Sequence, residues 1–112
     1  MEMRTVTKCR NLAPDMGGQA GEAAALLKTL ANQNRLMIVS TLADGERSVG
    51  QLEEMLGIHQ PTLSQQLTVL REAGIIATRR DAKQIFYRLA EERAARLITA
   101  LQDIFCRDGT KR

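Results

Sequence analysis

The chain has 112 residues, which is enough for one domain and too few for two domains with separate cores. Hydrophobic residues make up 44% of it and charged residues 26%, so a packed core is expected and wholesale disorder is excluded. Lysine and arginine outnumber aspartate and glutamate by 16 to 13, and this mild basic excess suits an anionic partner.

The sequence has no segment suited to export or membrane insertion. The first ten residues, MEMRTVTKCR, lack the apolar stretch of a secretion signal. The longest apolar run, Ala23 to Leu27, is far shorter than a membrane span. Two cysteines, Cys9 and Cys106, are too few for a disulfide-built secreted scaffold. We therefore expect a cytoplasmic protein that makes no membrane contact.

Residues 1–18 combine charges, Pro14 and a glycine pair without an apolar period, which predicts a flexible N-terminal arm. Residues 19–106 are predicted to form one folded domain, followed by a short tail over residues 107–112. Within the domain, alanines and leucines recur at helical spacing from Gln19 to Ala31, which predicts a first helix. Asn32 is a suitable N-cap for a second helix ending near Gly45.

A third and a fourth helix are predicted on either side of a short turn. Ser48 and Gln51 have the spacing of a capping box, and Gly57 can end the third helix in the left-handed conformation. Pro61 is suited to the first position of the fourth helix. The positions expected to face inward are apolar and helically spaced: Val49, Leu52, Met55 and Leu56 on the third helix and Leu63, Leu67 and Leu70 on the fourth.

A hairpin and a last helix complete the predicted order. Residues 75–78 and 85–89 are rich in β-branched and aromatic residues and flank a charged segment, Arg79–Gln84, as in a two-stranded hairpin. The acidic pair that follows favours a helix start, and apolar positions then continue in one stripe to Phe105. Four helices, a hairpin and a helix predict a mainly α fold with a small β-hairpin, the winged helix-turn-helix. Because so small a core leaves the apolar stripes of the first and last helices uncovered, we expect a homodimer.

The outward face of the fourth helix is polar and suited to DNA. Gln65 can pair with adenine through both amide groups, and Ser64 can donate or accept a hydrogen bond. Thr62 and Gln60, near the helix start, suit phosphate oxygens. Alone, such a face would be interpreted as an ordinary solvated surface. Next to it, however, three bases with one acid are predicted at the hairpin tip, where they could reach phosphates or a minor groove: Arg79, Arg80 and Lys83.

The segment LLKTLANQNRLMIVSTLADGERSVGQLEEMLGIHQPTLSQQLTVLREAGIIATRRDAKQIFYRL resembles the ArsR/SmtB winged-helix repressors, and the resemblance covers about residues 20–106. Its most specific parts are L-A-N-x-x-R-L, Q-P-T-L-S-Q-Q-L-x-x-L-R-E-A-G-I and R-x-x-x-Q-I-F-Y-R-L. Within that family, G-E-R-S-V-G-Q-L, K-Q-I-F-Y-R-L and L-x-x-I-F-C are most similar to BigR/SqrR-type sensors. Such proteins are homodimeric repressors that persulfides or other oxidised sulfur species release from DNA.

The resemblance implies DNA contacts from residues of the fourth helix and the hairpin, namely Gln60, Thr62, Ser64, Gln65, Arg79, Arg80 and Lys83. It also implies that Cys106 is the sensor thiol of the last helix and that reactive sulfur species are the inducer. The partner thiol of that subfamily corresponds to Ser40, which keeps the shape and loses the redox chemistry. Three explanations are open: a natural variant that uses Cys9 instead, an engineered cysteine-to-serine replacement that holds the reduced state, or a member that senses something else.

Other chemistry finds little support in the residues. Some members of the wider family bind metals through cysteine pairs on the third helix or Asp/His sets on the last, but here those helices carry neither a cysteine pair nor a histidine. The single histidine, His59, precedes the fourth helix, where a cap or a phosphate contact is the better interpretation. No metal and no cofactor is expected. An enzyme is not expected either, because His59 and Cys106 are not a convergent nucleophile and base and no phosphate-binding glycine motif is present.

Two functions therefore remain from the sequence. The first is a dimeric repressor of operator DNA that cysteine persulfide or oxidised-sulfur chemistry releases. The second is a winged-helix repressor of the same family that responds to a non-thiol ligand or a partner. A protein-only adaptor would leave the basic hairpin without a purpose.

Overall fold

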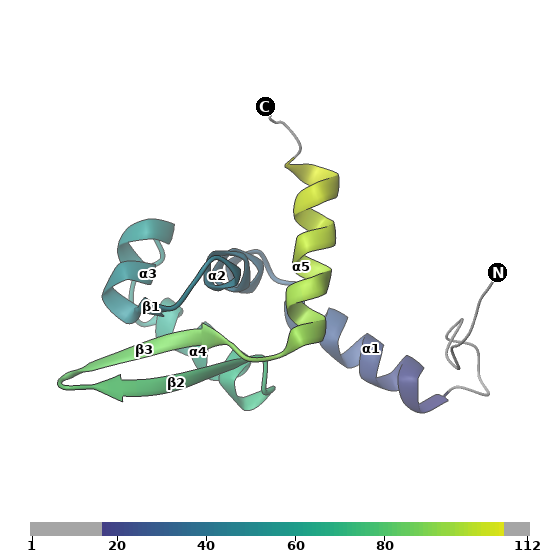
Figure 1. Ribbon diagram of the computed structural model, residues 1–112, viewed down its shortest axis with the longest axis horizontal. Helices are drawn as coiled ribbons and strands as arrows, with labels where there is room; N and C mark the ends of the chain where they lie inside the picture. The colour runs from purple at the N-terminus through teal and green to yellow at the C-terminus, as the bar shows by residue number, and fades with distance from the viewer. Residues whose placement is uncertain (1–16, 107–112) are drawn as a thin grey trace.

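The structure, a computed structural model, describes residues 17–106, and the arm and tail expected at residues 1–18 and 107–112 lie almost entirely outside this range. Five helices and three strands follow one another in the order expected for a winged helix-turn-helix (Figure 1). They are α1 (Gly17–Leu30), α2 (Gln33–Ala43), β1 (Arg47–Ser48), α3 (Val49–Leu56), α4 (Thr62–Glu72), β2 (Ile76–Asp81), β3 (Gln84–Leu89) and α5 (Glu92–Phe105).

The helix ends follow from local hydrogen bonds. The Asn32 side chain accepts from the backbone N–H of Arg35 at the start of α2, as expected of an N-cap. The capping box of Ser48 and Gln51 is complete in both directions at the start of α3. Gly57 ends α3 with φ of 69°, a conformation that glycine adopts without steric cost. Pro61 is the N-cap of α4 and not its first helical residue, so the helix begins one residue later than predicted, at Thr62.

The core lies between α2, α3, α4 and the first half of α5. The predicted leucine stripe of α4 is buried, as are Leu52 of α3 and Ile98 of α5. Met55 was predicted to face inward, and this is wrong: 55% of it is exposed. In so short a helix, Leu52 covers the core-facing side, and Leu56 packs against its edge. The stripe of α5 is likewise buried only in part, because its last turns extend past the other elements (Figure 1).

The sheet has three strands in the order β1-β3-β2, all antiparallel, where a two-stranded hairpin was predicted. The additional strand, β1, has two residues, Arg47 and Ser48, which pair with Tyr87 and Phe86 of β3. Strands β2 and β3 and the turn between them form the wing. The wing strands are also longer than predicted, since Asp81 pairs with Gln84 across a two-residue turn.

Candidate DNA-binding surface and sensor cavity

Helix α4, the proposed reading helix, presents Gln65 to solvent. Leu63, Leu67 and Leu70 fix the rotation of the helix because they fill the core. Gln65 is therefore exposed, and among residues 17–106 its amide has no hydrogen-bond partner. An exposed, unpaired amide on a helix surface can make both hydrogen bonds that recognise adenine.

The polar residues at the start of α4 are partly engaged with the helix itself. The Gln60 Oε1 accepts from the Ser64 backbone N–H at 3.1 Å, and the Ser64 hydroxyl donates to the Pro61 carbonyl at 3.1 Å. The amide nitrogen of Gln60 and the lone pairs of Ser64 remain directed to solvent, because both side chains are exposed. Thr62 is exposed as well. Four exposed polar residues are thus brought together at the start of α4: Gln60, Thr62, Ser64 and Gln65.

The neighbouring glutamine, Gln66, was not singled out from the sequence. Its side chain is half-buried, and its Oε1 accepts from the Arg35 Nη1 at 2.8 Å. The two residues are 31 positions apart, so no local pattern indicates the pair. The one signal in the sequence was the position of Arg35 within the L-A-N-x-x-R-L motif that carries the family resemblance.

The three bases predicted to contact DNA from the wing are not equivalent. Arg79 was predicted at the hairpin tip, but it lies within β2, and its guanidinium binds the Glu46 carboxylate through two hydrogen bonds of 2.8 Å. It also stacks over Phe86, 4.8 Å from the ring centre, and lies 3.5 Å from Asp81. All three side chains are exposed, but Arg80 and Lys83 make no ion pair within the described part of the chain. Free positive charge near the tip is therefore at Arg80 and Lys83, and Arg88 of β3, which is also exposed, forms no ion pair among residues 17–106.

The Glu46 pair adjusts the titration of both partners. The hydrogen bonds from Arg79 hold the pKa of Glu46 below its usual value, and the same bonds raise the pKa of Arg79. At neutral pH the pair is therefore fully ionised. It joins the segment before β1 to the wing and neutralises much of the Arg79 charge.

His59 lies in the turn before α4, as expected. Its Nδ1 is 3.6 Å from a Glu53 carboxylate oxygen, and its side chain is largely exposed. Within residues 17–106, no group of three metal-ligating side chains comes together. The region around His59 thus offers no metal site.

Cys106 and Ser40 line the same cavity. The thiol of Cys106 is at the C-terminal end of α5 and is exposed. Ser40 is on α2, and its hydroxyl accepts from the Gln102 Nε2 at 2.7 Å. The cavity has a volume of about 370 Å³ and is otherwise mostly apolar, being lined by Leu36, Met37, Ser40, Thr41, Leu56, Ile98, Leu101, Gln102, Phe105 and Cys106. We call it the sensor cavity. Cys9 lies outside the described residues.

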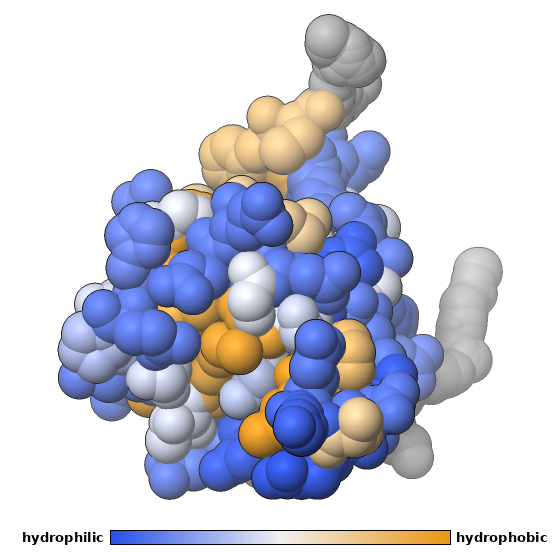
Figure 2. Space-filling view, turned by 90° about the vertical axis from the view of Figure 1, so that its left-hand side faces the viewer, coloured by the Kyte–Doolittle hydropathy of each residue, from blue (hydrophilic) through white to orange (hydrophobic). Residues whose placement is uncertain are grey.

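The end of α5 beside this cavity is an exposed apolar surface. Ile104 and Phe105 are 64% and 78% exposed. Figure 2 shows hydrophobic surface at the upper end of α5, above a largely hydrophilic body. Leu27 of α1 is also more than half exposed. Both helices whose stripes were expected to remain uncovered thus expose apolar side chains, and the two most exposed large apolar residues of the described range are on α5.

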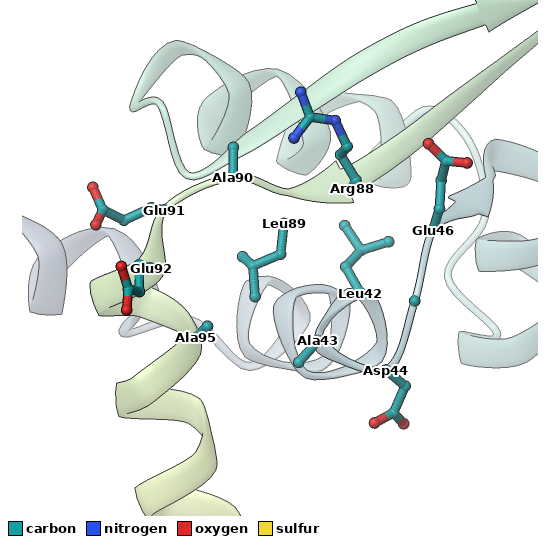
Figure 3. Close-up of a pocket in the computed structure, with 11 residues that line it drawn as sticks. Leu42, Ala43, Asp44, Glu46, Arg88, Leu89, Ala90, Glu91, Glu92 and Ala95 are labelled. Atoms are coloured by element: carbon teal, nitrogen blue, oxygen red, sulfur yellow. The ribbon is translucent and has the colours of Figure 1, made fainter.

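A second hollow, of about 470 Å³, lies between the end of α2, the end of β3 and the start of α5 (Figure 3). Two of its four acidic side chains have structural partners. Glu46 binds Arg79, and Glu91 caps α5 through the Arg93 backbone N–H and contacts the Arg93 guanidinium at 3.0 Å. These hydrogen bonds lower the pKa of Glu91. The hollow is thus bordered by residues that stabilise the fold.

Comparison with known proteins places this geometry in a family. Residues 32–78 match the model of the bacterial regulatory protein, arsR family. A biofilm growth-associated repressor of Agrobacterium fabrum is 69% identical over 93 residues, which are 83% of this chain and 80% of that protein. The chain belongs to the arsR family of bacterial regulatory proteins.

Further relatives of the arsR family extend the match to the whole domain. A biofilm growth-associated repressor of Xylella fastidiosa is 59% identical over 94% of this chain and 92% of that protein. The crystal structure of the transcriptional repressor BigR from Xylella fastidiosa superposes with a TM-score of 0.79 at 62% identity, covering 84% of this chain and 96% of that one. Reduced HlyU from Vibrio cholerae gives a TM-score of 0.80 at 37% identity, over 85% and 100% of the two chains.

The family assignment confirms the predicted fold and class. The chain is an arsR-family, DNA-binding transcriptional regulator with a winged helix-turn-helix, and its family consists of regulators and not of enzymes. In the described part of the chain, no helix combines the length and the apolar character needed to cross a bilayer.

Proposed function

We propose that the protein is a homodimeric repressor that leaves its operator when persulfide or oxidised-sulfur chemistry modifies Cys106. The observation that carries the proposal is the position of Cys106, an exposed thiol on the rim of a cavity that also contains Ser40. These are the two positions at which the BigR/SqrR-type sensors are expected to carry their thiols. Similarity to repressors at 59% and 69% identity supports the same direction of regulation.

The operator contacts that we propose are those that the resemblance implied. The residues differ in how much they contribute to DNA binding. Gln65 reads a base in the major groove, and the residues around the start of α4 hold phosphates. Arg80 and Lys83 supply the free charge of the wing, whereas Arg79 acts mainly through its pair with Glu46. The proposed set is Gln60, Thr62, Ser64, Gln65, Arg79, Arg80 and Lys83.

One thiol is sufficient for the first step. The Cys106 thiolate attacks the outer sulfur of a persulfide, RS–SH, forming Cys106–S–SH and releasing the thiolate RS⁻. A second thiolate, for which Cys9 is the candidate, can then attack the inner sulfur and close a disulfide, releasing HS⁻. Since Ser40 cannot take this part, the product on this chain is either a persulfide or a bridge to Cys9.

Release from DNA follows if the modification changes the dimer. The apolar side chains of Ile104 and Phe105 are next to Cys106 in sequence and are exposed. We propose that a second copy covers this surface, because a two-fold dimer places two reading helices about one turn of DNA apart. A polar group added at Cys106 then lies beside the interface and can alter that spacing.

The alternative function is a repressor of the same family that binds a non-thiol ligand. Ser40 favours it, because a serine hydroxyl has no redox chemistry and here accepts a hydrogen bond from Gln102. The mostly apolar lining of the sensor cavity suits a small apolar molecule.

DNA binding measured by fluorescence anisotropy separates the two functions. The full-length protein is titrated onto a duplex from the region upstream of its own gene after reduction, after treatment with glutathione persulfide and after dithiothreitol. We expect tight binding, loss of binding and recovery, in that order. Cys106→Ser should bind throughout, and Cys9→Ser should show whether a bridge is required. Persulfide-insensitive binding by the unsubstituted protein would exclude the thiol switch and favour the alternative.

A further inference from the structure

One side chain joins three helices of the DNA-binding unit. The Arg35 Nε donates to the carbonyl of Thr29 in the last turn of α1, and its Nη1 donates to the Gln66 Oε1 of α4 at 2.8 Å. Its own backbone N–H donates to the Asn32 side chain at the start of α2. The arginine of the L-A-N-x-x-R-L motif therefore connects α1, α2 and α4 at one point.

The chemistry of this contact suits a fixed geometry. The last carbonyls of a helix have no partner within the helix, and a cation near them is favoured by the helix dipole. A guanidinium is planar, so its Nε and Nη1 hold their two acceptors at a set distance and angle, which a lysine ammonium does not do. Arg35 and Gln66 are both half-buried, so water competes less for these bonds than at an exposed site.

Helix α1 has few other attachments to the protomer. Leu30 is its one fully buried residue in the described range, and most of its other side chains are exposed. Leu26 is partly buried against the core, and an exposed ion pair places the Arg93 Nη1 3.2 Å from a Glu22 oxygen. Figure 1 shows α1 extending away from the body, opposite the wing. The end of α1 that meets the body is thus held by Leu26, Leu30 and Arg35.

We infer that Arg35 is a positioning residue that couples the orientation of α1 to that of α4. The buried leucines set the rotation of α4, and through Gln66 Arg35 holds the helix at that orientation relative to α1, so that Gln65 meets the bases without Arg35 touching DNA itself. This inference rests on the proposed function in one respect, that α4 reads the operator. The two adjacent glutamines then have different roles. Gln65 faces outward and recognises a base, whereas Gln66 faces inward and aligns the helix through Arg35.

The test is a double-mutant cycle on DNA affinity. Arg35→Met, Gln66→Met and the double variant are compared with Arg96→Met, which removes one exposed charge from α5. Two duplexes are used, one selected from a random-sequence pool by the unsubstituted protein and a scrambled one. Thermal unfolding and sedimentation velocity are measured for every variant, so that affinity is compared only between folded proteins of the same assembly state.

We expect each single variant to bind the selected duplex about tenfold more weakly, equivalent to about 1.4 kcal/mol. The double variant should lose no more than either single one, because both remove the same contact. Affinity for the scrambled duplex and the affinity of Arg96→Met should change little. Gln66→Glu should retain binding, since a carboxylate also accepts from Arg35, while Arg35→Lys should not.

Several results would overturn the inference. Folded single variants that bind the selected duplex as well as the unsubstituted protein would do so, as would losses that add in the double variant. If Arg35→Met loses affinity equally for both duplexes, and Arg96→Met loses as much, Arg35 contributes only a positive charge that attracts any DNA. If Arg35→Met does not fold, Gln66→Met and Arg35→Lys decide alone. Failure of the unsubstituted protein to enrich any duplex would instead contradict the proposed function, and is recognised before any variant is made.

Discussion

Gln65 and Gln66 are adjacent on α4, yet one amide faces solvent and the other accepts a hydrogen bond from Arg35. Arg79 and Arg80 are adjacent on the wing, yet one binds Glu46 and the other is free of ion pairs within residues 17–106. In both pairs the difference follows from which side of the helix or strand the residue occupies. Residue type alone therefore does not identify a DNA contact on this surface.

Replacement of Gln65 tests direct base recognition. Gln65→Ala should lose about 1–3 kcal/mol at one base pair of the operator, because the two hydrogen bonds of the amide are removed and the other bases are still read. Binding to a set of duplexes with single base-pair changes measures the preference. If Gln65→Ala keeps the preference of the unsubstituted protein at every position, Gln65 does not read a base.

The wing arginines should differ in their salt dependence. Arg80→Ala is expected to weaken binding to all duplexes alike and to reduce the slope of log K against log salt by about 0.9, the contribution of one phosphate contact. Arg79→Ala should reduce this slope less, because Glu46 already neutralises its charge. Anisotropy titrations at four or more salt concentrations give both slopes. Equal reductions would mean that Arg79 leaves Glu46 to bind a phosphate.

At the scale of the elements, the signals that predicted the fold are local. Asn32, the capping box of α3 and Gly57 act within a few residues, and the leucine stripe of α4 is a simple helical period, so all four were recognised in advance. Strand β1 was missed because two residues are too few to show alternation. The full length of the wing was missed because both of its faces are exposed near the tip, so charged residues occupy positions at which strands are usually apolar.

The candidate site was likewise predictable only where a local pattern determines it. The exposure of Gln65 follows from the burial of the leucines on the other side of α4. The bonds of Arg35 to Gln66 and of Gln102 to Ser40 join residues 31 and 62 positions apart. They depend on how the helices pack, which no local pattern contains. For the same reason, the pairing of Arg79 with Glu46, 33 positions away, was not foreseen.

Helix α3 offers a direct test of the corrected core. Leu52 is fully buried, whereas Met55 is more than half exposed. Leu52→Ala should therefore lower the free energy of unfolding by about 2–5 kcal/mol, and Met55→Ala should change it by less than about 0.5 kcal/mol. Urea unfolding followed by circular dichroism measures both. A comparable loss for the two variants would return Met55 to the core or place it in an interface.

At the scale of the whole molecule, the end of α5 carries the two most exposed large apolar side chains of the described range, Ile104 and Phe105. Ile104→Asp should produce monomers, because a carboxylate in the proposed apolar interface would lose its hydration without gaining a partner. Ile104 is largely exposed in the protomer, so thermal unfolding of the isolated chain should be little affected. Sedimentation velocity gives the assembly state. Thr99→Asp, on an exposed site elsewhere on α5, is the control. A dimeric Ile104→Asp would place the interface elsewhere.

Ser48 is at once the last residue of β1 and the N-cap of α3, and its strand partner, Phe86, belongs to the wing. Together with the bond between Glu46 and Arg79, this ties the wing to the start of α3, from which a short turn leads to α4. An operator duplex must then present its major groove to α4 and its adjacent minor groove or phosphates to the wing, at the spacing that the fold gives these two elements. A-form duplexes have a deep, narrow major groove that does not admit a helix. We expect an RNA–DNA hybrid of the operator sequence to compete poorly with the operator duplex for binding.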